Sequence, residues 1–230
     1  IAARGLPIAV VGVPKTIDND IYLMDRSFGF ETAFSVSSMI LRGAHNEAKC
    51  HYNGVALVKL MGRESGFIAA SSALAVPSVN FVLIPEMDFD LEGPAGFLGV
   101  LERRLARKHH ALVVVSEGAG QRFFQKGSPG KDKSGNVIFN DIGIYLKERI
   151  SRHLKSLNVS HTVKYIDPSY VIRSGRAIPN DAKFATVLAQ YAVHGAMAGK
   201  TGFVIGRLHE EYVHIPIAEA VSRRKTIDLE

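Results

Sequence analysis

Short apolar runs alternate with longer amphipathic stretches along the chain. The apolar runs are rich in valine, isoleucine and leucine, and they predict strands at residues 8–13, 55–60, 81–84, 112–115, 163–166, 203–205 and 212–215. Between them, apolar residues recur at helical spacing and predict helices at residues 30–49, 65–75, 96–108, 141–156 and 181–198. This alternation is typical of α/β layers built on a mostly parallel sheet with flanking helices. The last two runs, joined by "HEE", predict a hairpin at a sheet edge.

The first apolar run, "LPIAVVGVP", is followed directly by the polar segment "KTIDND". We expect the run to be a fully buried parallel strand, and ligands of such folds bind just beyond the carboxyl ends of the strands. Lys15, Thr16, Asp18, Asn19 and Asp20 therefore fall where a ligand would bind. A carboxylate there can accept the proton of an attacking hydroxyl group or contact magnesium. The alternative is that Asp18 or Asp20 is the N-cap of the next helix.

Polar clusters also follow four later strands. They read "MGRESG", "PEMDFD", "SEGAG" and "YIDPSYVIRSGR". Because the carboxyl ends of parallel strands meet at one edge of a sheet, five such clusters predict a binding site at that edge. Arg63 and Arg173 offer the planar donors that suit phosphate, and Glu117 is placed to accept hydrogen bonds from hydroxyl groups. The alternatives are a surface ion pair for each arginine and a solvated loop position for Lys15.

Composition and charge narrow the class of protein. The net charge of +6 fits an anionic ligand or a basic surface, but no basic run with interleaved aromatics indicates nucleic-acid binding. No apolar run approaches the roughly 20 residues that cross a bilayer. The single cysteine, Cys50, excludes an internal disulfide and agrees with a reducing compartment. His45, Glu47, Cys50 and His51 do not converge on one helix face, so we expect surface residues there rather than a metal site. Residues 125–136 predict a polar, glycine-rich loop.

Six motifs together resemble those of the 6-phosphofructokinase family. They are "GVPKTIDNDI", "FGFETA", "LVKLMGRESGFIAA", "LIPE", "EGAGQ" and "YIDPSYVIR", and they are most similar to the branch of plant, trypanosomal and related bacterial enzymes. The resemblance runs in order through nearly the whole chain, and "TIDND" with "MGR" is its most specific part. It implies a glycolytic, allosteric kinase that phosphorylates the C1 hydroxyl of fructose 6-phosphate to give fructose 1,6-bisphosphate. It also implies two similar α/β domains with the site in the cleft between them.

The resemblance assigns a role to each residue at a matching motif position. Asp18 matches the catalytic base, Thr16 matches a substrate contact, and Asp20 matches the carboxylate that helps to organise the transferred phosphate and magnesium. The matching substrate-binding positions are Met61, Gly62 and Arg63 of the "MGR" segment, Glu117 for the sugar, Tyr170 and Arg173 for the 6-phosphate, and Lys164 as a cation directed toward that phosphate. Gly54 stands where bacterial ATP enzymes carry an arginine that bridges subunits.

The resemblance leaves the identity of the phosphoryl donor open between ATP and pyrophosphate. Lys15 stands where well-known bacterial ATP enzymes carry glycine, while lysine occurs in pyrophosphate-dependent enzymes and in the ATP-using branch. The segment "LVKLMGRESGFIAA" slightly favours ATP, with Mg²⁺ as the expected metal. The family's glycine-rich donor segments, including "GGDG" or "GGDD", precede the first strand and are missing here, so we expect a fragment. The competing hypothesis is a non-catalytic subunit that binds a sugar phosphate.

Domain boundaries and partners also follow from the resemblance. Residues 1–29 and 172–222 would belong to the larger, donor-side domain, residues 30–171 would form the smaller, substrate-side domain, and residues 223–230 would be a C-terminal segment. We expect a cytoplasmic homo-oligomer, a dimer or a tetramer. We expect it to bind fructose 6-phosphate and neither nucleic acid nor membranes.

Overall fold

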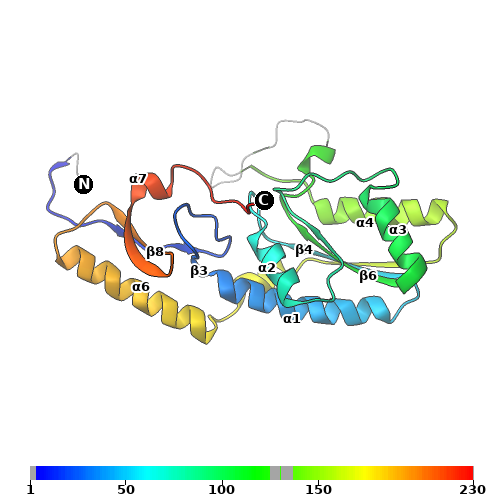
Figure 1. Ribbon diagram of the computed structural model, residues 1–230, viewed down its shortest axis with the longest axis horizontal. Helices are drawn as coiled ribbons and strands as arrows, with labels where there is room; N and C mark the ends of the chain where they lie inside the picture. Colours follow the sequence, from blue (N-terminus) through cyan, green and yellow to red (C-terminus); the bar gives the residue numbers. More distant parts are fainter. Residues whose placement is uncertain (1–3, 125–129, 131–136, 230) are drawn as a thin grey trace. The chain divides into compact units, whose positions relative to one another are not determined.

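The structure is a computed structural model that describes residues 4–124, 130 and 137–229 (Figure 1). The chain divides into two compact units. Unit 1 comprises Ile1–Ala33 and Gly175–Lys225, and unit 2 comprises Phe34–Ser174 and Thr226–Glu230. Each unit combines a sheet with helices, as the α/β prediction requires. The assignment of a donor-side and a substrate-side role to these parts of the chain stays a prediction.

Unit 2 is built on a four-stranded parallel sheet. Its strands, in spatial order, are β5 (Phe81–Leu83), β6 (His110–Ser116), β4 (Gly54–Leu60) and β7 (Thr162–Ile166). Helices α3 (Phe97–Lys108) and α4 (Ile142–Ser156) cover one face of the sheet, and α1 (Phe30–Lys49) covers the other (Figure 1). Because both faces are covered, the central strands β4 and β6 are mostly apolar, as expected for a buried parallel sheet, and Lys59 of β4 is an exception.

Capping residues and the spacing of apolar residues explain where the helices of unit 2 begin and end. Asp141 is the N-cap of α4, and its carboxylate accepts hydrogen bonds from the backbone N–H groups of Gly143 and Ile144. Four buried residues of α4 recur at four-residue spacing and form its core-facing stripe: Ile142, Leu146, Ile150 and Leu154. Helix α3 ends at Lys108, and its C-cap residue His109 adopts the left-handed conformation with φ of 57°. Helix α2 (Phe67–Ala75) follows β4.

Unit 1 contains a three-stranded sheet in the order β1, β8, β9. Strand β1 (Val11–Gly12) is parallel to β8 (Phe203–Leu208), and β8 is antiparallel to β9 (Glu211–Pro216). His209 and Glu210 turn the hairpin with positive φ angles, so the prediction of an edge hairpin is confirmed. Helix α6 (Pro179–Met197) buries Phe184 and Leu188 against β8, and the short helix α7 (Ile217–Ala220) follows β9. Strands β2 (Lys15–Thr16) and β3 (Phe28–Gly29) form a separate parallel pair.

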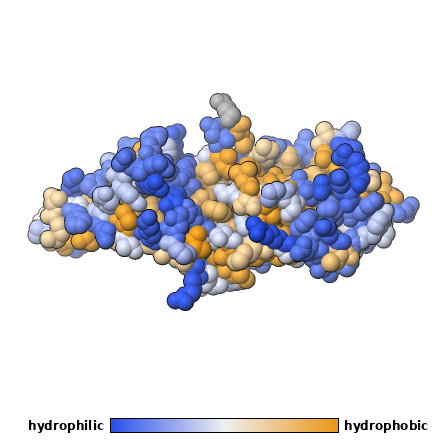
Figure 2. All heavy atoms as spheres, turned by 60° about the horizontal axis from the view of Figure 1, so that its bottom comes forward, coloured by the Kyte–Doolittle hydropathy of each residue, from blue (hydrophilic) through white to orange (hydrophobic). Residues whose placement is uncertain are grey.

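The prediction of a fully buried first strand was wrong. Only two residues of the run 8–13 form a strand, and the Ile8 side chain is 53% exposed. Within the described residues, β1 has one hydrogen-bonded neighbour, β8, and lies at the edge of its sheet. Residues 8–10 lie outside this short strand and are exposed, so the run lacks the cover on both faces that a fully buried strand has. Other apolar residues are also exposed, and Figure 2 shows hydrophobic atoms at the surface of one face.

One helix near the expected site was not predicted. Helix α5 (Ser169–Ser174) lies within the motif "YIDPSYVIRSGR", which was interpreted only as a polar strand end. The predicted loop at residues 125–136 lies outside the described residues, apart from Gly130. In the described part of the chain, no helix combines the length and apolar character required to span a membrane.

Candidate functional site

The loops that follow β4 and β6 are joined by their backbones. The N–H of Glu117 donates to the carbonyl of Leu60 at 2.9 Å, and the N–H of Gly118 donates to the carbonyl of Gly62 at 3.1 Å. Gly62 has a φ of 125°, which favours glycine. A Cβ atom on Gly118 would collide with the carbonyl of Arg63. Glycine is therefore required at this close approach, which joins "MGR" to "EGAG".

This pairing brings together two residues that the sequence singled out. The Arg63 Nε atom lies 3.8 Å from the Glu117 Oε1 atom, and both side chains are half-buried. Arg63 also donates to the carbonyl of Val137 at 2.9 Å and lies over the Phe139 ring. Met61 is only 5% exposed, so its side chain belongs to the core rather than to an open surface. A guanidinium beside a carboxylate can recognise a ligand that carries both hydroxyl and anionic groups.

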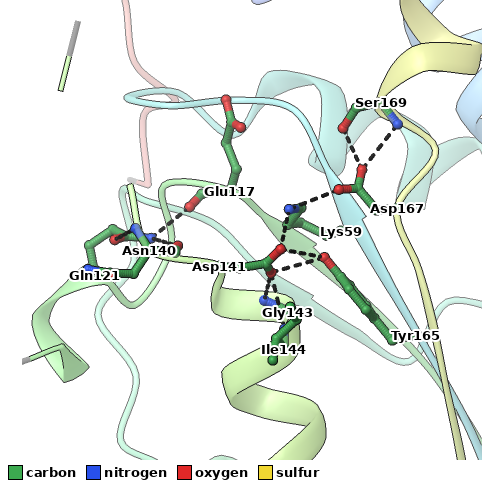
Figure 3. Close-up of polar contacts among 10 residues, drawn as sticks. All are labelled: Lys59, Glu117, Gln121, Asn140, Asp141, Gly143, Ile144, Tyr165, Asp167 and Ser169. Atoms are coloured by element: carbon green, nitrogen blue, oxygen red, sulfur yellow. Dashed lines mark hydrogen bonds and ion pairs between the residues drawn. The ribbon is translucent and has the colours of Figure 1, made fainter. Parts of the chain in front are cut away.

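The Glu117 loop is held by a glutamine that was not singled out from the sequence. The Gln121 side-chain amide donates to the backbone carbonyl of Glu117 at 2.8 Å and to that of Asn140 at 3.0 Å (Figure 3). The Asn140 N–H donates back to the Gln121 side chain at 3.2 Å. These bonds leave the Glu117 carboxylate outside the network and fix its backbone.

A largely buried lysine beside the same loops was also missed. The Lys59 Nζ atom, near the carboxyl end of β4, lies 2.8 Å from the Asp141 carboxylate and 3.0 Å from the Asp167 carboxylate (Figure 3). The Tyr165 hydroxyl donates to Asp141 at 3.0 Å. The sequence did contain a signal, because Lys59 is the one charged residue in the apolar strand "GVALVKL". A lone charge in a buried strand indicates a paired partner.

The contacts of this network shift the pKa values of its members. Burial lowers the pKa of Lys59, but the hydrogen bonds with Asp141 and Asp167 outweigh that effect and raise it above the ordinary lysine value. Burial raises the pKa of Asp141 and Asp167, yet hydrogen bonds, including those from Lys59, hold both values below the usual range. Burial is the main cause that raises the pKa of Tyr165 to about 12. Lys59 and both aspartates are therefore charged at neutral pH.

The remaining predicted site residues of unit 2 are Tyr170, Arg173 and Lys164, and they lie on two different elements, α5 and β7. Tyr170 and Arg173 are three residues apart on α5, so they share one side of that helix, and Tyr170 is 85% exposed. Both are thus available to a ligand. Lys164 lies in the middle of β7, and its ammonium contacts Glu47 of α1 at 3.5 Å. The structure places Lys164 on Glu47 and does not bring it together with Arg63 and Glu117.

In unit 1, the segment "TIDND" is organised around the buried Asn19. Asn19 has a φ of 57°, and its side-chain oxygen accepts from the N–H of Ser27 at 3.0 Å. The Thr16 hydroxyl accepts from the N–H of Asp18 at 3.2 Å. Asp18 and Asp20 flank Asn19 ten or more residues before helix α1 begins at Phe30, so the N-cap alternative is wrong. Lys15 is exposed in β2.

The segment Arg223–Lys225 lies along this loop, a contact that the sequence did not predict. Arg224 forms an ion pair with Asp20, and the ammonium of Lys225 donates to the carbonyls of Met24 at 2.7 Å and Asp25 at 3.0 Å. Burial lowers the pKa of Lys225 to about 8, against the opposing effect of nearby carboxylates. The Asp20 carboxylate, predicted to face phosphate and magnesium, is thus engaged by a cation of the chain itself.

The described residues contain no group of three or more histidine, cysteine, aspartate or glutamate side chains placed to hold a metal ion. Glu47 contacts His51 and Lys164, and His45 contacts His110. Asp18 and Asp20 remain as carboxylates that could meet a metal carried by phosphate oxygens. Such a site needs only one or two carboxylates from the protein.

These features define an α/β protein with polar loops at the carboxyl edge of a parallel sheet. The chain belongs to the phosphofructokinase family, whose model matches residues 2–196. It is 50% identical to the ATP-dependent 6-phosphofructokinase of Borreliella burgdorferi, over 99% of this chain and 52% of that protein. It is 45% identical to ATP-dependent 6-phosphofructokinase 5, chloroplastic, of Arabidopsis thaliana, over 98% of this chain and 42% of that protein.

Solved structures share the fold. A pyrophosphate-dependent phosphofructokinase from Marinobacter aquaeolei superposes with a TM-score of 0.76 at 24% identity, covering 99% of this chain and 56% of that one. A Pichia pastoris phosphofructokinase superposes with a TM-score of 0.69 at 22% identity, covering 93% of this chain and 21% of that one. The family and α/β fold implied by the sequence motifs are confirmed. The chain spans about half the length of the curated relatives that it matches.

Proposed function

We propose that the protein carrying this chain is a 6-phosphofructokinase that transfers a phosphoryl group to the C1 hydroxyl of fructose 6-phosphate. The main support is family membership over residues 2–196, with relatives at 45–50% identity that are named for this activity. The geometry of unit 2 agrees with a sugar-phosphate site, because Arg63 and Glu117 lie side by side while Tyr170 and Arg173 share one exposed side of α5.

In this proposal Asp18 is the general base that takes the proton of the C1 hydroxyl, and Thr16 contacts the substrate in the same loop. Glu117 accepts hydrogen bonds from sugar hydroxyl groups, and the "MGR" segment contacts the substrate through the Arg63 side chain and the backbone of Met61 and Gly62. Tyr170 and Arg173 hold the 6-phosphate, whereas Lys164, which is paired with Glu47, lies outside this contact. Catalysis then depends on positioning and on neutralising the charge of the transferred group.

We propose ATP as the donor. Relatives at 45–50% identity are named ATP-dependent, whereas the pyrophosphate-dependent structure is only 24% identical. Lys15 is exposed beside the catalytic loop, where it would meet donor phosphate. Mg²⁺ would arrive with that phosphate and neutralise part of its charge. In this proposal the Asp20 carboxylate contacts both Arg224 and the magnesium ion. We also propose that the protein is a cytoplasmic homo-oligomer.

The test is turnover by the complete polypeptide that carries this chain. Fructose 6-phosphate would be offered with Mg²⁺ and either ATP or pyrophosphate, and fructose 1,6-bisphosphate would be measured. Turnover with ATP alone is the expected result, and turnover with pyrophosphate alone would reverse the choice of donor. Tight binding of fructose 6-phosphate without turnover on either donor would favour a non-catalytic binding subunit, although such a subunit has no use for a base at Asp18.

A further inference from the structure

Lys59 is a charged residue within an apolar strand, and it joins two otherwise separate loops. Its side chain is only 12% exposed, and its ammonium contacts Asp141, which precedes α4, and Asp167, which precedes α5. A buried charge is tolerated only where it is paired and hydrogen-bonded. With two carboxylates at 2.8 and 3.0 Å, Lys59 meets this condition, and its ammonium links the two aspartates.

The contact of Lys59 with Asp167 leads to α5. The Asp167 carboxylate accepts hydrogen bonds from the backbone N–H and the hydroxyl of Ser169, the first residue of the helix. A helix of six residues is not stable by itself and depends on tertiary contacts. Ile172 supplies one such contact, since it is only 2% exposed, and the Asp167 cap supplies another. The position of Tyr170 and Arg173 therefore depends on the orientation of Asp167, which Lys59 holds.

The contact of Lys59 with Asp141 leads to the Glu117 loop. Asp141 caps α4 with one carboxylate oxygen and contacts Lys59 with the other. The residue before it, Asn140, is joined through Gln121 to the backbone carbonyl of Glu117 (Figure 3). The close packing of Gly143 against the Tyr165 ring leaves no room for a Cβ atom and keeps this end of α4 against β7.

We propose that Lys59 is a positioning residue that holds both arms of the sugar-phosphate site, the Glu117 loop and helix α5, in position relative to each other. The inference rests on the proposed function, because it assigns those arms to one substrate. Without the ammonium, Asp141 and Asp167 would repel each other and turn toward water, and both arms would shift. Lys59 acts through these aspartates and does not touch the substrate, so its loss affects substrate binding more than the chemical step.

The test replaces Lys59 by methionine in the complete polypeptide, since methionine keeps the length of the side chain and removes the charge. We expect Lys59→Met to weaken fructose 6-phosphate binding about tenfold by calorimetry and to raise its KM to a similar extent, because small displacements of positioning groups have large effects. The kcat value should change less than about threefold, and the donor KM should not change. Lys147→Met, on the exposed face of α4, is the matched control and should behave as wild type.

Two further variants keep the test decisive if Lys59→Met folds poorly. Asp167→Asn retains an acceptor for Ser169 but loses the charge that pairs with Lys59, so it should also raise the fructose 6-phosphate KM selectively. Lys59→Arg should restore most of the affinity, because a guanidinium can still bridge two carboxylates. Wild-type affinity for fructose 6-phosphate in folded Lys59→Met and Asp167→Asn would overturn this inference alone. A wild-type protein that does not bind fructose 6-phosphate would overturn the proposed function and, with it, the inference.

Discussion

The guanidinium of Arg224 forms an ion pair with the carboxylate of Asp20, although 204 positions separate them in sequence. Backbone contacts support the pair, since Ile21 and Arg224 form an antiparallel bridge and the N–H of Lys225 donates to the Asp20 carbonyl at 2.9 Å. The loop that carries Asp18 and Asp20 is therefore fixed in part by a distant segment. The proposed roles of Asp18 and Asp20 require such a fixed backbone.

We expect Arg224→Gln to lower kcat about tenfold, because the Asp20 loop loses its partner and its geometry. The free energy of unfolding should fall by about 1 kcal/mol or less, since Arg224 is largely exposed and water screens the pair. Steady-state kinetics and chemical denaturation measure the two effects. Arg223→Gln is the control, because Arg223 contacts Tyr22 and leaves the Asp20 pair intact. Equal losses in both variants would contradict a specific role for Arg224.

We expect Asp18→Asn to reduce kcat by about a hundredfold to ten-thousandfold, the usual range for the loss of a general base. Binding of fructose 6-phosphate should change little, because an asparagine amide keeps the size of the side chain. Turnover assays and calorimetry on the complete polypeptide measure both quantities. The matched control is Asp88→Asn, a change at an exposed carboxylate of unit 2. Near-normal turnover in Asp18→Asn would remove Asp18 from the role of base.

We expect Arg173→Ala to raise the fructose 6-phosphate KM by about tenfold to a hundredfold, because one charge-assisted hydrogen bond contributes about 1.5–3 kcal/mol. The kcat value should fall by much less. Arg176→Ala, at a nearby exposed arginine outside α5, is the matched control and should leave KM unchanged. A large fall in kcat with an unchanged KM would argue against the anchoring of phosphate by Arg173.

We expect Gly118→Ala to destabilise the protein by about 1–3 kcal/mol, as is usual when atoms are forced into a packed site. The new Cβ atom collides with the carbonyl of Arg63, so the two loops must separate. Gly43→Ala in α1 is the control, because its Cβ atom would meet open space and alanine favours a helix by roughly 1 kcal/mol. The denaturant concentration at the midpoint of unfolding should therefore fall in Gly118→Ala and rise in Gly43→Ala.

The lowered pKa of Lys225 predicts that the free energy of unfolding depends on pH. Burial lowers its pKa from 10.5 to about 8, so between these values the unfolded chain binds more protons than the folded chain. The cost of burying the charged form is fully present below pH 8, and it is relieved as the pH rises toward 10.5. We expect the difference in unfolding free energy between wild type and Lys225→Met to shift in favour of wild type over this range. A difference that stays constant with pH would show that Lys225 titrates normally.

Much of the fold was predictable from the sequence because local chemistry specifies it. The apolar strands at the centre of unit 2, the long helix α1 and the edge hairpin were predicted near their observed bounds. The sequence placed Arg63 and Glu117 after strands of one sheet, and β4 and β6 are indeed parallel neighbours, but the polar cluster after β1 follows a strand of another sheet. Helix α5 was missed because six residues carry too little periodicity to distinguish a helix from a loop.

The sequence by itself determined the α/β class, the parallel sheet and the motifs that mark the family. These properties depend on hydrophobic periodicity and on the residues next to each strand, which are local in the chain. Only the tertiary structure decided that Lys59 joins Asp141 to Asp167, that Arg224 engages Asp20, and that the first apolar run is exposed. Burial and charge pairing depend on which segments meet in space, and residues that are distant along the chain leave no periodic pattern that reveals their contact.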